Sequence, residues 1–533
     1  MNKKLILTSA IAYCLLLLHA CGVGGGESAA DTNSEDGVYY TEEVAMAEDA
    51  TEGDVFYEEE LMEEHVEEPF NTEEYDYMPE NEFLSPGTNP LSTFSIDVDN
   101  ASYTNVRRMI EQGDQPPVDA VRTEEFVNYF DYNYPVPNKK DVFSVYTEMG
   151  DCPWNDENRL LHIGLKGYTI PTEDLPPSNL VFLLDVSGSM EDENKLPLLK
   201  KSFKLLVDKL NAKDRVSIVT YAGDERLVLE STSCENKEEI KEAIDNLYSG
   251  GSTNGEGGIE MAYEQALEHY LPNGNNRVIL ATDGDFNVGR SSGGELTRLI
   301  EEKRDKGVYL TILGFGMGNL KDSKMESLAD HGNGNYFYID DIRESNRVLV
   351  TNLAGTLFTI AKDVKIQVEF NPEYVAEYRL IGYENRIMNA EDFADDKKDA
   401  GELGAGHTVT AIYEIVPGKA AKSKLKYQQT TSNHSDEIAL IKLRYKQPKE
   451  SKSKLIELTV LDEQQNWEQS STDFKFSAAV AGFSLILRES AYIGDFTYDD
   501  VIDICMKVVS IEEREKVNFI QMVESAKLLT KTS

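Results

Sequence analysis

The alternation of short apolar runs with amphipathic helical patterns between residues 178 and 357 is the most constraining feature of this sequence. The apolar runs are expected to form strands at 180–186, 215–222, 226–231, 277–282, 308–315 and 336–339. Between them, residues 196–210 repeat large apolar side chains at every third or fourth position, which predicts a helix with one apolar face. Strands that alternate with helices predict an α/β fold with a doubly wound, mostly parallel sheet covered on both faces.

Three oxygen-bearing side chains directly follow the first of these strands. Residues 181–190 read VFLLDVSGSM, so Asp185, Ser187 and Ser189 stand at alternate positions after the apolar run. In an open α/β sheet, ligands bind beyond the carboxyl ends of the strands, and this stretch ends there. A hydrogen-bonded turn would be the simpler interpretation of these residues taken alone.

Two further loops are expected at the same edge of the sheet. The loop GGSTNGEGG at 250–258 precedes a helix and offers Thr253, while LATDGDFN at 280–287 ends a strand and offers Asp283. Hydroxyl and carboxylate oxygens around one point suit Mg²⁺ or a similar hard cation. The five side chains together therefore predict a cation site rather than a simple turn.

In type and order these five residues resemble the metal-ion-dependent adhesion site of von Willebrand factor type A domains. The resemblance implies that Ser187, Ser189 and Thr253 bind Mg²⁺, or Mn²⁺ or Ca²⁺, through hydroxyls. It implies that Asp185 and Asp283 contact the ion mostly through water, and that an Asp or Glu carboxylate of a partner completes the coordination. Outside this domain, segments such as NPLSTFSIDVDNASY and LFTIAKDVKIQVEFNPE are similar to those flanking it in a group of bacterial lipoproteins.

The segments on either side of the type A domain, which we place at 176–357, are expected to fold together. Residues 81–175 show an α+β pattern in which Ser102 could cap a helix. After residue 358 apolar and polar side chains alternate, which predicts antiparallel strands with one solvent-facing side, followed by terminal helices up to residue 533. Neither flank has enough strands to close a core, so we predict one β-rich α+β unit into which the type A domain is inserted.

The N-terminus has the features of a secretory signal peptide over residues 1–20. Two lysines precede an apolar run at 5–18, which is too short to span a bilayer comfortably. The sequence LHAC at 18–21 resembles a lipobox, which implies cleavage and lipidation at Cys21, and anchoring in the cell envelope at the outer membrane. An ordinary cleaved signal with a chance cysteine remains the alternative.

Residues 21–80 are expected to form a disordered acidic tether. Between residues 22 and 80 the chain has 21 Asp or Glu and no Lys or Arg. The whole chain carries a formal net charge of -44, which makes binding to nucleic acid improbable. The predicted partners are an envelope or extracellular protein that offers a carboxylate, and the membrane through the lipid anchor.

These features favour a metal-dependent binding protein with no enzymatic activity. A metal-dependent hydrolase of the cell envelope is the alternative, for which Glu256 would be the one base close to the ion, and a purely structural site is a third. Cys152 and Cys505 could form a disulfide or remain buried thiols. For His407, as for the other histidine near a glycine-rich loop, a structural or surface role is expected.

Overall fold

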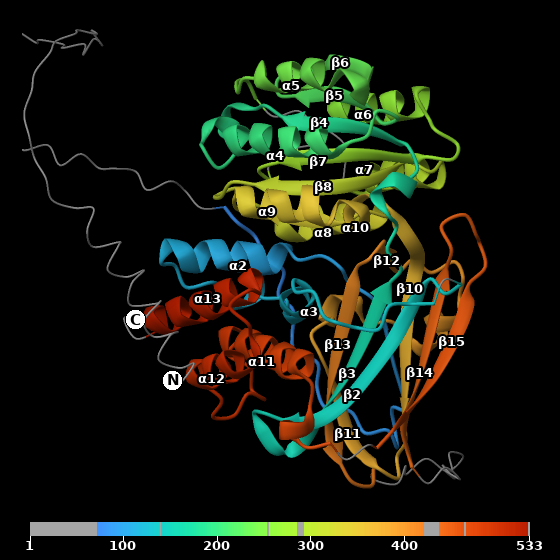
Figure 1. The fold of residues 1–533 in the computed structure, drawn as a ribbon, viewed down its shortest axis with the longest axis vertical. Helices are drawn as coiled ribbons and strands as arrows, with labels where there is room; N and C mark the ends of the chain where they lie inside the picture. Colours follow the sequence, from blue (N-terminus) through green and yellow to red (C-terminus); the bar gives the residue numbers. More distant parts are fainter. Residues whose placement is uncertain are drawn as a thin grey trace, which may run out of the picture. The chain divides into compact units, whose positions relative to one another are not determined.

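One mostly parallel sheet and two antiparallel sheets, with helices around them, form the described part of the chain in the computed structural model (Figure 1). The structure describes residues 72–138, 140–252, 255–284, 293–420, 436–462 and 465–530. All of them belong to one unit, Glu67–Ser533. No helix within these ranges combines the length and apolar character that crossing a membrane requires. The predicted signal peptide, Cys21 and most of the predicted tether lie outside the described residues.

The predicted doubly wound sheet is confirmed. Its six strands run in the order β6-β5-β4-β7-β8-β9, and only the pair β5 and β6 is antiparallel. The strands are β4 (Ser178–Asp185), β5 (Arg215–Tyr221), β6 (Glu225–Ser233), β7 (Asn275–Thr282), β8 (Tyr309–Phe315) and β9 (Tyr336–Ile339). The first of these six strands along the chain, β4, thus lies inside the sheet between two parallel neighbours.

Helices cover both faces of this sheet. Alternate side chains of β4 point to opposite faces, so Phe182 packs against Phe203 of α4 (Leu196–Lys209), with ring centroids 4.6 Å apart. On the other face Val181 joins a buried cluster with Ile259 of α6 (Gly255–Glu268). The remaining helices of this domain are α5 (Lys237–Asp245), α7 (Gly293–Asp305), α8 (Asp322–His331), α9 (Ile342–Asn346), the π-helical turn η5 (Arg347–Thr351) and α10 (Leu353–Leu357).

Strands from both flanks share the two antiparallel sheets, as predicted. The strand order in the first sheet is β1-β10-β14-β15, and β12 also pairs with β10. The strand order in the second sheet is β11-β13-β3-β2. The strands are β1 (Leu91–Ser95), β2 (Phe143–Cys152), β3 (Asn155–Gly167), β10 (Thr359–Phe370), β11 (Val375–Ile381), β12 (Gly401–Gly404), β13 (Thr408–Pro417), β14 (Glu437–Lys446) and β15 (Lys454–Leu461). Since β1, β2 and β3 precede the type A domain and the other strands follow it, the two flanks form one unit around an inserted domain.

The two antiparallel sheets pack face to face through aromatic side chains. Phe370 of the first sheet lies 5.1 Å from Tyr413 of the second, measured between ring centroids. The outer face of the second sheet is not solvent-facing, which corrects our expectation. Helix α11 (Thr472–Leu487) covers it, and the Nδ1 atom of His162 lies 3.0 Å from the hydroxyl of Ser477. An all-round apolar helix such as α11 needs cover on every side, which explains why it lies between the sheet and other helices.

A helical cluster completes the flanking unit. It contains α2 (Ala101–Gln112), α3 (Thr123–Asn128), α11, α12 (Tyr498–Val508) and α13 (Arg514–Thr530). Cys152 and Cys505 are both buried in this cluster as free thiols, so the possible disulfide is absent. Ser102 does not cap α2. The helix begins one residue earlier, and the Ser102 hydroxyl donates instead to the carbonyl oxygen of Ala120 at 2.6 Å.

The folded part of the chain begins before residue 81, where we placed the end of the tether. The backbone N–H of Thr72 donates to the carbonyl oxygen of Gly318 at 2.7 Å. Glu73 forms an ion pair with Arg108 at 2.9 Å, and both side chains are at least nine-tenths buried. Acidic residues at the end of the predicted tether are thus held by specific partners, which composition alone could not indicate.

A buried charge network joins the type A domain to both flanks. Two guanidinium groups, those of Arg122 and Arg386, face six carboxyl groups. The carboxyl groups are those of Asp97, Asp99, Glu125, Asp322, Glu326 and Asp330. Because burial penalises the charged form, the pKa of Glu326 is raised to about 6 and that of Asp99 is raised well above its ordinary value.

Arg386 connects all three segments in this network. Its Nε donates to Asp97 of the N-terminal flank at 3.1 Å, and its Nη2 donates to Glu326 of α8 at 2.8 Å. Its Nη1 donates to Asp330, also on α8. Arg386 itself belongs to the C-terminal flank, so a single guanidinium ties the two flanks to the inserted domain.

We predict that Arg386→Met lowers the free energy of unfolding by about 3–5 kcal/mol at neutral pH, because it leaves buried carboxylates without their cation. A raised carboxyl pKa means that the folded state binds the proton more tightly than the unfolded chain, so protonation favours folding as the pH falls through 6. The loss of unfolding free energy in Arg386→Met should therefore become smaller as the pH is lowered from about 7.5 to about 5. Urea denaturation measures both effects.

Arg343→Met is the matched control, since the Arg343 side chain is 58% exposed. It should cost no more than about 1 kcal/mol. Equal losses for the two variants, or a deficit for Arg386→Met that grows as the pH falls, would contradict the role of the network.

Candidate functional site

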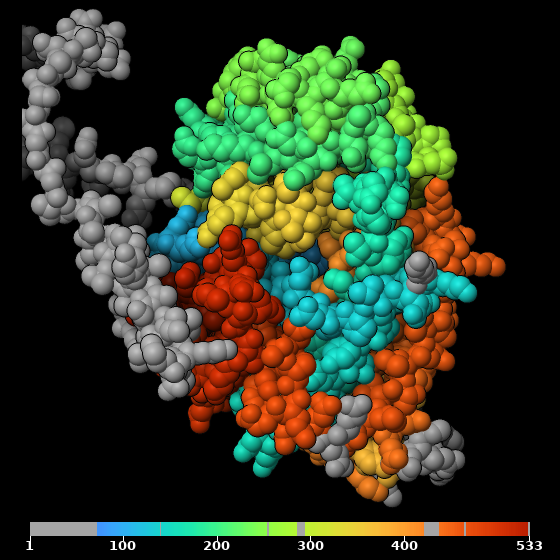
Figure 2. Space-filling model, viewed as in Figure 1, coloured from blue at the N-terminus to red at the C-terminus, as the bar shows by residue number. Residues whose placement is uncertain are grey.

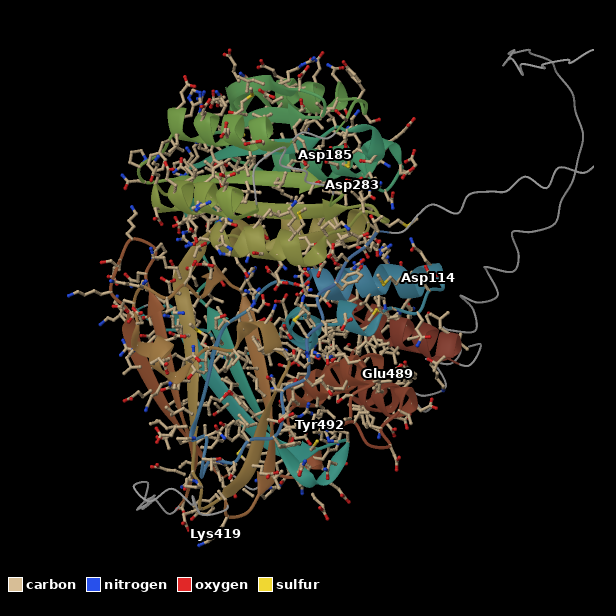
Figure 3. All side chains as sticks on the ribbon, turned by 180° about the vertical axis from the view of Figure 1, so that it is seen from behind. Asp114, Asp185, Asp283, Lys419, Glu489 and Tyr492 are labelled. Carbon is tan, nitrogen blue, oxygen red and sulfur yellow. The ribbon has the colours of Figure 1, made fainter. Side chains whose placement is uncertain are left out.

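The end of β4 places Asp185 in the interior of the protein. The strand is paired with β5 on one side and β7 on the other along its whole length, and Asp185 is fully buried at its carboxyl end. Asp283 directly follows β7 and is also fully buried. The two carboxylates therefore lie next to each other at one edge of the sheet (Figure 3). This is the edge at which the sequence predicted a cation site.

Hydrogen bonds hold the Asp185 carboxylate in one orientation. Its Oδ1 accepts the backbone N–H of Ser187 at 2.9 Å. Its Oδ2 accepts the hydroxyls of Tyr221 at 3.0 Å and Thr282 at 3.1 Å. Burial raises the pKa of Asp185 to about 6, and the neighbouring negative charge of Asp283 adds to the increase. An added cation would favour the ionised form of this carboxyl group.

The two predicted serines lie beside each other on the loop after β4. The hydroxyl oxygens of Ser187 and Ser189 are 3.0 Å apart. The loop that leads toward Thr253 touches the same place, because the backbone N–H of Gly188 donates to the carbonyl oxygen of Gly251 at 3.1 Å. Thr253 itself lies outside the described residues, so its predicted role stays a prediction. Four of the five predicted ligands are thus brought to one edge.

Lys195 is a member of this site that the sequence did not indicate. Its Nζ donates to Asp283 Oδ2 at 3.1 Å and to the carbonyl oxygen of Ser189 at 2.8 Å. The Lys195 side chain is only 6% exposed. Gly316, with a φ of +71°, packs so closely on the stem of this lysine that a Cβ atom would lie 2.5 Å from it. The ammonium group is therefore kept against the carboxylate.

The residues present fit a hard divalent cation. Asp283 Oδ1 is buried and has no hydrogen-bond partner among the described residues. An unpaired buried carboxylate oxygen is costly, and it is explained when a cation binds it directly or through water. Two carboxylates and two hydroxyls are the oxygen ligands that Mg²⁺, Mn²⁺ and Ca²⁺ prefer. Asp185, Ser187, Ser189 and Asp283 would hold such an ion.

Comparison with known proteins places the chain in a family. Residues 179–351 match the von Willebrand factor type A domain, residues 69–162 match a family described as von Willebrand factor, and residues 355–529 match one described as the C-terminal part of uncharacterized protein YfbK. Uncharacterized protein YfbK of Escherichia coli K12 is 40% identical over 483 residues, which cover 88% of this chain and 83% of that protein. The chain belongs to the YfbK family.

Other similar proteins cover a smaller share of the chain or share less of its sequence. Inter-alpha-trypsin inhibitor heavy chain H3 of Homo sapiens is 30% identical over 176 residues, which cover 31% of this chain and 19% of that protein. A solved structure, von Willebrand factor type A from Catenulispora acidiphila, covers 74% of this chain and 91% of its own, with 14% identity and a TM-score of 0.42. In this chain the match to the type A domain is thus flanked on both sides by matches to other family models.

Replacing Lys195 tests how its positive charge affects the binding of a cation at this site. We expect Lys195→Met to bind Mg²⁺ at least tenfold more tightly, because a buried positive charge a few ångströms from a cation repels it by a few kcal/mol even at an effective dielectric constant of about 20. Isothermal titration calorimetry with Mg²⁺ measures the change.

The same substitution at Lys201, which is exposed on α4, provides the control and should leave the affinity unchanged. Weaker Mg²⁺ binding by Lys195→Met would show that the lysine mainly holds Asp283 in place rather than opposing the ion.

Proposed function

We propose that this protein is a metal-dependent protein-binding lipoprotein of the cell envelope, without enzymatic activity. The observation that carries the proposal is the convergence of two buried carboxylates and two serine hydroxyls at the carboxyl edge of the sheet, with Asp283 Oδ1 left unpaired. A divalent ion at this edge supplies an open coordination position that a carboxylate of the partner fills. The type A domain family, in which such sites mediate adhesion, supports this assignment.

The charge of the site favours an acidic partner group. Asp185 and Asp283 contribute two negative charges when ionised, and Lys195 contributes one positive charge beside Asp283. A bound divalent cation would leave the site with one net positive charge inside a protein that is strongly acidic overall. An anionic oxygen of the partner would then neutralise the site, whereas a neutral ligand would not.

The groups around the site favour binding over hydrolysis. A hydrolase needs a base or a nucleophile in addition to the ion. Lys195 donates to Asp283 and to the carbonyl oxygen of Ser189. Burial beside Asp185 raises the pKa of Tyr221 well above its ordinary value, so its hydroxyl, which donates to Asp185, is not suited to accept a proton at neutral pH. Both side chains serve to hold the carboxylates.

We predict that Asp185→Ala weakens Mg²⁺ or Mn²⁺ binding by roughly a hundredfold or more, since changes outside the direct ligands of a metal already cost about 10–100-fold. Circular dichroism should show an intact fold, because the hydrogen-bonded partners of Asp185 lie at the end of the strand rather than along it. Calorimetry measures the affinity.

Glu193→Ala is the matched control, because Glu193 lies in the same loop and its side chain is exposed. Proteins retained from an envelope extract by the parent should be released by chelator, and Asp185→Ala should not retain them. Retention that survives chelation, or turnover of an ester substrate that requires the ion, would remove the binding proposal.

The lipid anchor is a separate part of the proposal. It rests on LHAC at residues 18–21, with Cys21 as the modified residue and the outer membrane as the location. Cys21→Ser should move the protein from the membrane fraction to the soluble fraction of the envelope, because the apolar run of the signal is too short to serve as a stable anchor. A variant that still sediments with membranes after a carbonate wash would contradict the anchor.

A further inference from the structure

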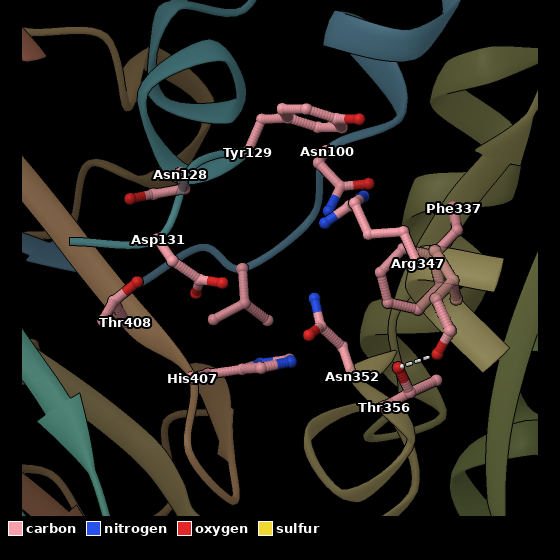
Figure 4. Close-up of a pocket in the computed structure, with 12 residues that line it drawn as sticks. Asn100, Asn128, Tyr129, Asp131, Phe337, Arg347, Asn352, Thr356, His407 and Thr408 are labelled. Carbon is pink, nitrogen blue, oxygen red and sulfur yellow. Dashed lines mark hydrogen bonds between the residues drawn. The ribbon is translucent and has the colours of Figure 1, made fainter. Parts of the chain in front are cut away.

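A polar pocket away from the cation site lies where the last helical segment of the type A domain meets the flanks (Figure 4). Its enclosed part has a volume of only about 30 Å³, which is room for the charged end of a small molecule rather than for a whole one. Asn100, Asp131 and His407 come from the flanks, while Arg347 and Asn352 come from the type A domain. Several of these residues have polar groups whose arrangement does not stabilise the fold, and a ligand would explain them.

The side chain of Asn100 does not make the hydrogen bond that is usual at its position in the helix. It occupies the N-cap of α2, where asparagine usually accepts a backbone N–H of the first turn, but it makes no such bond. The residue is only 4% exposed, and its Oδ1 has no hydrogen-bond partner among the described residues. Figure 4 shows its carboxamide in the pocket. The carboxamide of Asn100 therefore faces the cavity instead of capping α2.

The π-helical turn η5 brings Arg347 and Asn352 to the same side. The backbone N–H of Asn352 donates to the carbonyl oxygen of Arg347 at 2.8 Å, across five residues. In an α-helix two residues five apart would point about 140° away from each other. The wider turn aligns them, and such turns are frequent at functional sites. The carboxamide of Asn352 forms no hydrogen bond in the part of the chain that the structure describes.

His407 forms the floor of the pocket. A Cβ atom on Gly355 would lie 2.2 Å from the imidazole ring, so the ring occupies space that only a glycine leaves open. Its Nδ1 is buried and has no hydrogen-bond partner within the described ranges. Burial lowers the pKa of His407 to about 4, so the ring is neutral at physiological pH and can donate or accept one hydrogen bond. A structural role, which the sequence favoured, leaves this unpaired nitrogen unexplained.

Two opposite charges face the pocket from opposite sides. The Nε and Nη2 atoms of Arg347 donate to Glu344, and its guanidinium lies 4.1 Å from the ring centroid of Tyr129. Its Nη1 has no hydrogen bond in the described part of the chain and can bind an anion. Asp131 is exposed at the other side of the pocket, and its side chain forms neither a hydrogen bond nor an ion pair with any described residue.

We propose that this pocket binds a small α-amino acid as its zwitterion, with the carboxylate at Arg347 and Asn100 and the ammonium group at Asp131. A ligand with only a negative charge would face repulsion from Asp131, and one with only a positive charge would face repulsion from Arg347. A zwitterion pairs with both, while the two carboxamides and the imidazole can accept or donate the remaining hydrogen bonds.

The side chain of such an amino acid has room outside the pocket. A neighbouring cleft of about 980 Å³ shares Tyr129, Asp131, Arg347 and Asn352 with the pocket. Figure 2 shows the face on which its walls meet, with the end of the type A domain in yellow and α13 in red. The binding site is therefore expected to be selective for the charged end of the ligand and tolerant of different side chains.

The test is isothermal titration calorimetry of the full chain with three separate probes: alanine, acetate and ethylammonium. Chelator is present throughout, so that a cation at Asp185 cannot bind a carboxylate. Alanine should bind about tenfold more tightly, or better, than ethylammonium, which lacks the contact with the mostly buried Arg347. It should bind a few-fold more tightly than acetate, which lacks only the contact with the exposed Asp131. Equal binding of acetate and alanine, or no binding of alanine at millimolar concentrations, would overturn the proposal.

Asp131→Asn provides a second measurement that does not threaten the fold, because the side chain is exposed. It should weaken alanine binding by up to about fivefold, as expected for a charge pair at an exposed side chain, and leave acetate binding equal or stronger. Asp114→Asn, at an exposed position after α2 (Figure 3), is the control and should bind alanine like the parent. Unchanged alanine binding by Asp131→Asn would also overturn the proposal.

Discussion

A carboxylate excluded from water needs donors or a cation to compensate its charge. Asp185 is in this position because β4 is held between two parallel strands, which leaves its last residue fully buried. Tyr221 and Thr282 donate to one oxygen of this carboxylate, and Ser187 donates to the other. The same sheet brings Asp283 alongside. The geometry of the proposed cation site therefore depends on strand burial more than on the loop that carries the serines.

The position of the type A domain depends on charge rather than on chain connectivity alone. The chain enters this domain after β3 of the second antiparallel sheet and returns in β10, which pairs with β1 in the first. Arg386 then links Asp97 of one flank to Glu326 of α8. Three carboxyl groups of this network, those of Asp97, Glu125 and Glu326, lie close enough to hold a metal ion. Arginine side chains already engage all three, so this cluster is better explained as a link between segments.

Strand ends were predictable from the sequence because apolar runs mark them, and Asp185 and Asp283 directly follow such runs. Lys195 was not predictable, since its contact with Asp283 depends on how α4 and the loop before it turn back toward the sheet. Partners far apart in the sequence were also missed: Asp97 and Arg386 are separated by 289 positions. The predicted cap at Ser102 was wrong, because the helix already begins at Ala101 and the Ser102 hydroxyl binds the carbonyl oxygen of Ala120 in a neighbouring segment instead.

Anomalous X-ray diffraction from crystals of the full chain grown with Mn²⁺ tests the central claim most directly. The account predicts an anomalous peak at the carboxyl edge of the sheet, within coordination distance of the Ser187 and Ser189 hydroxyls and bonded to Asp185 and Asp283 directly or through water. No peak at this edge, or a peak only among the carboxyl groups of Asp97, Glu125 and Glu326, would contradict it.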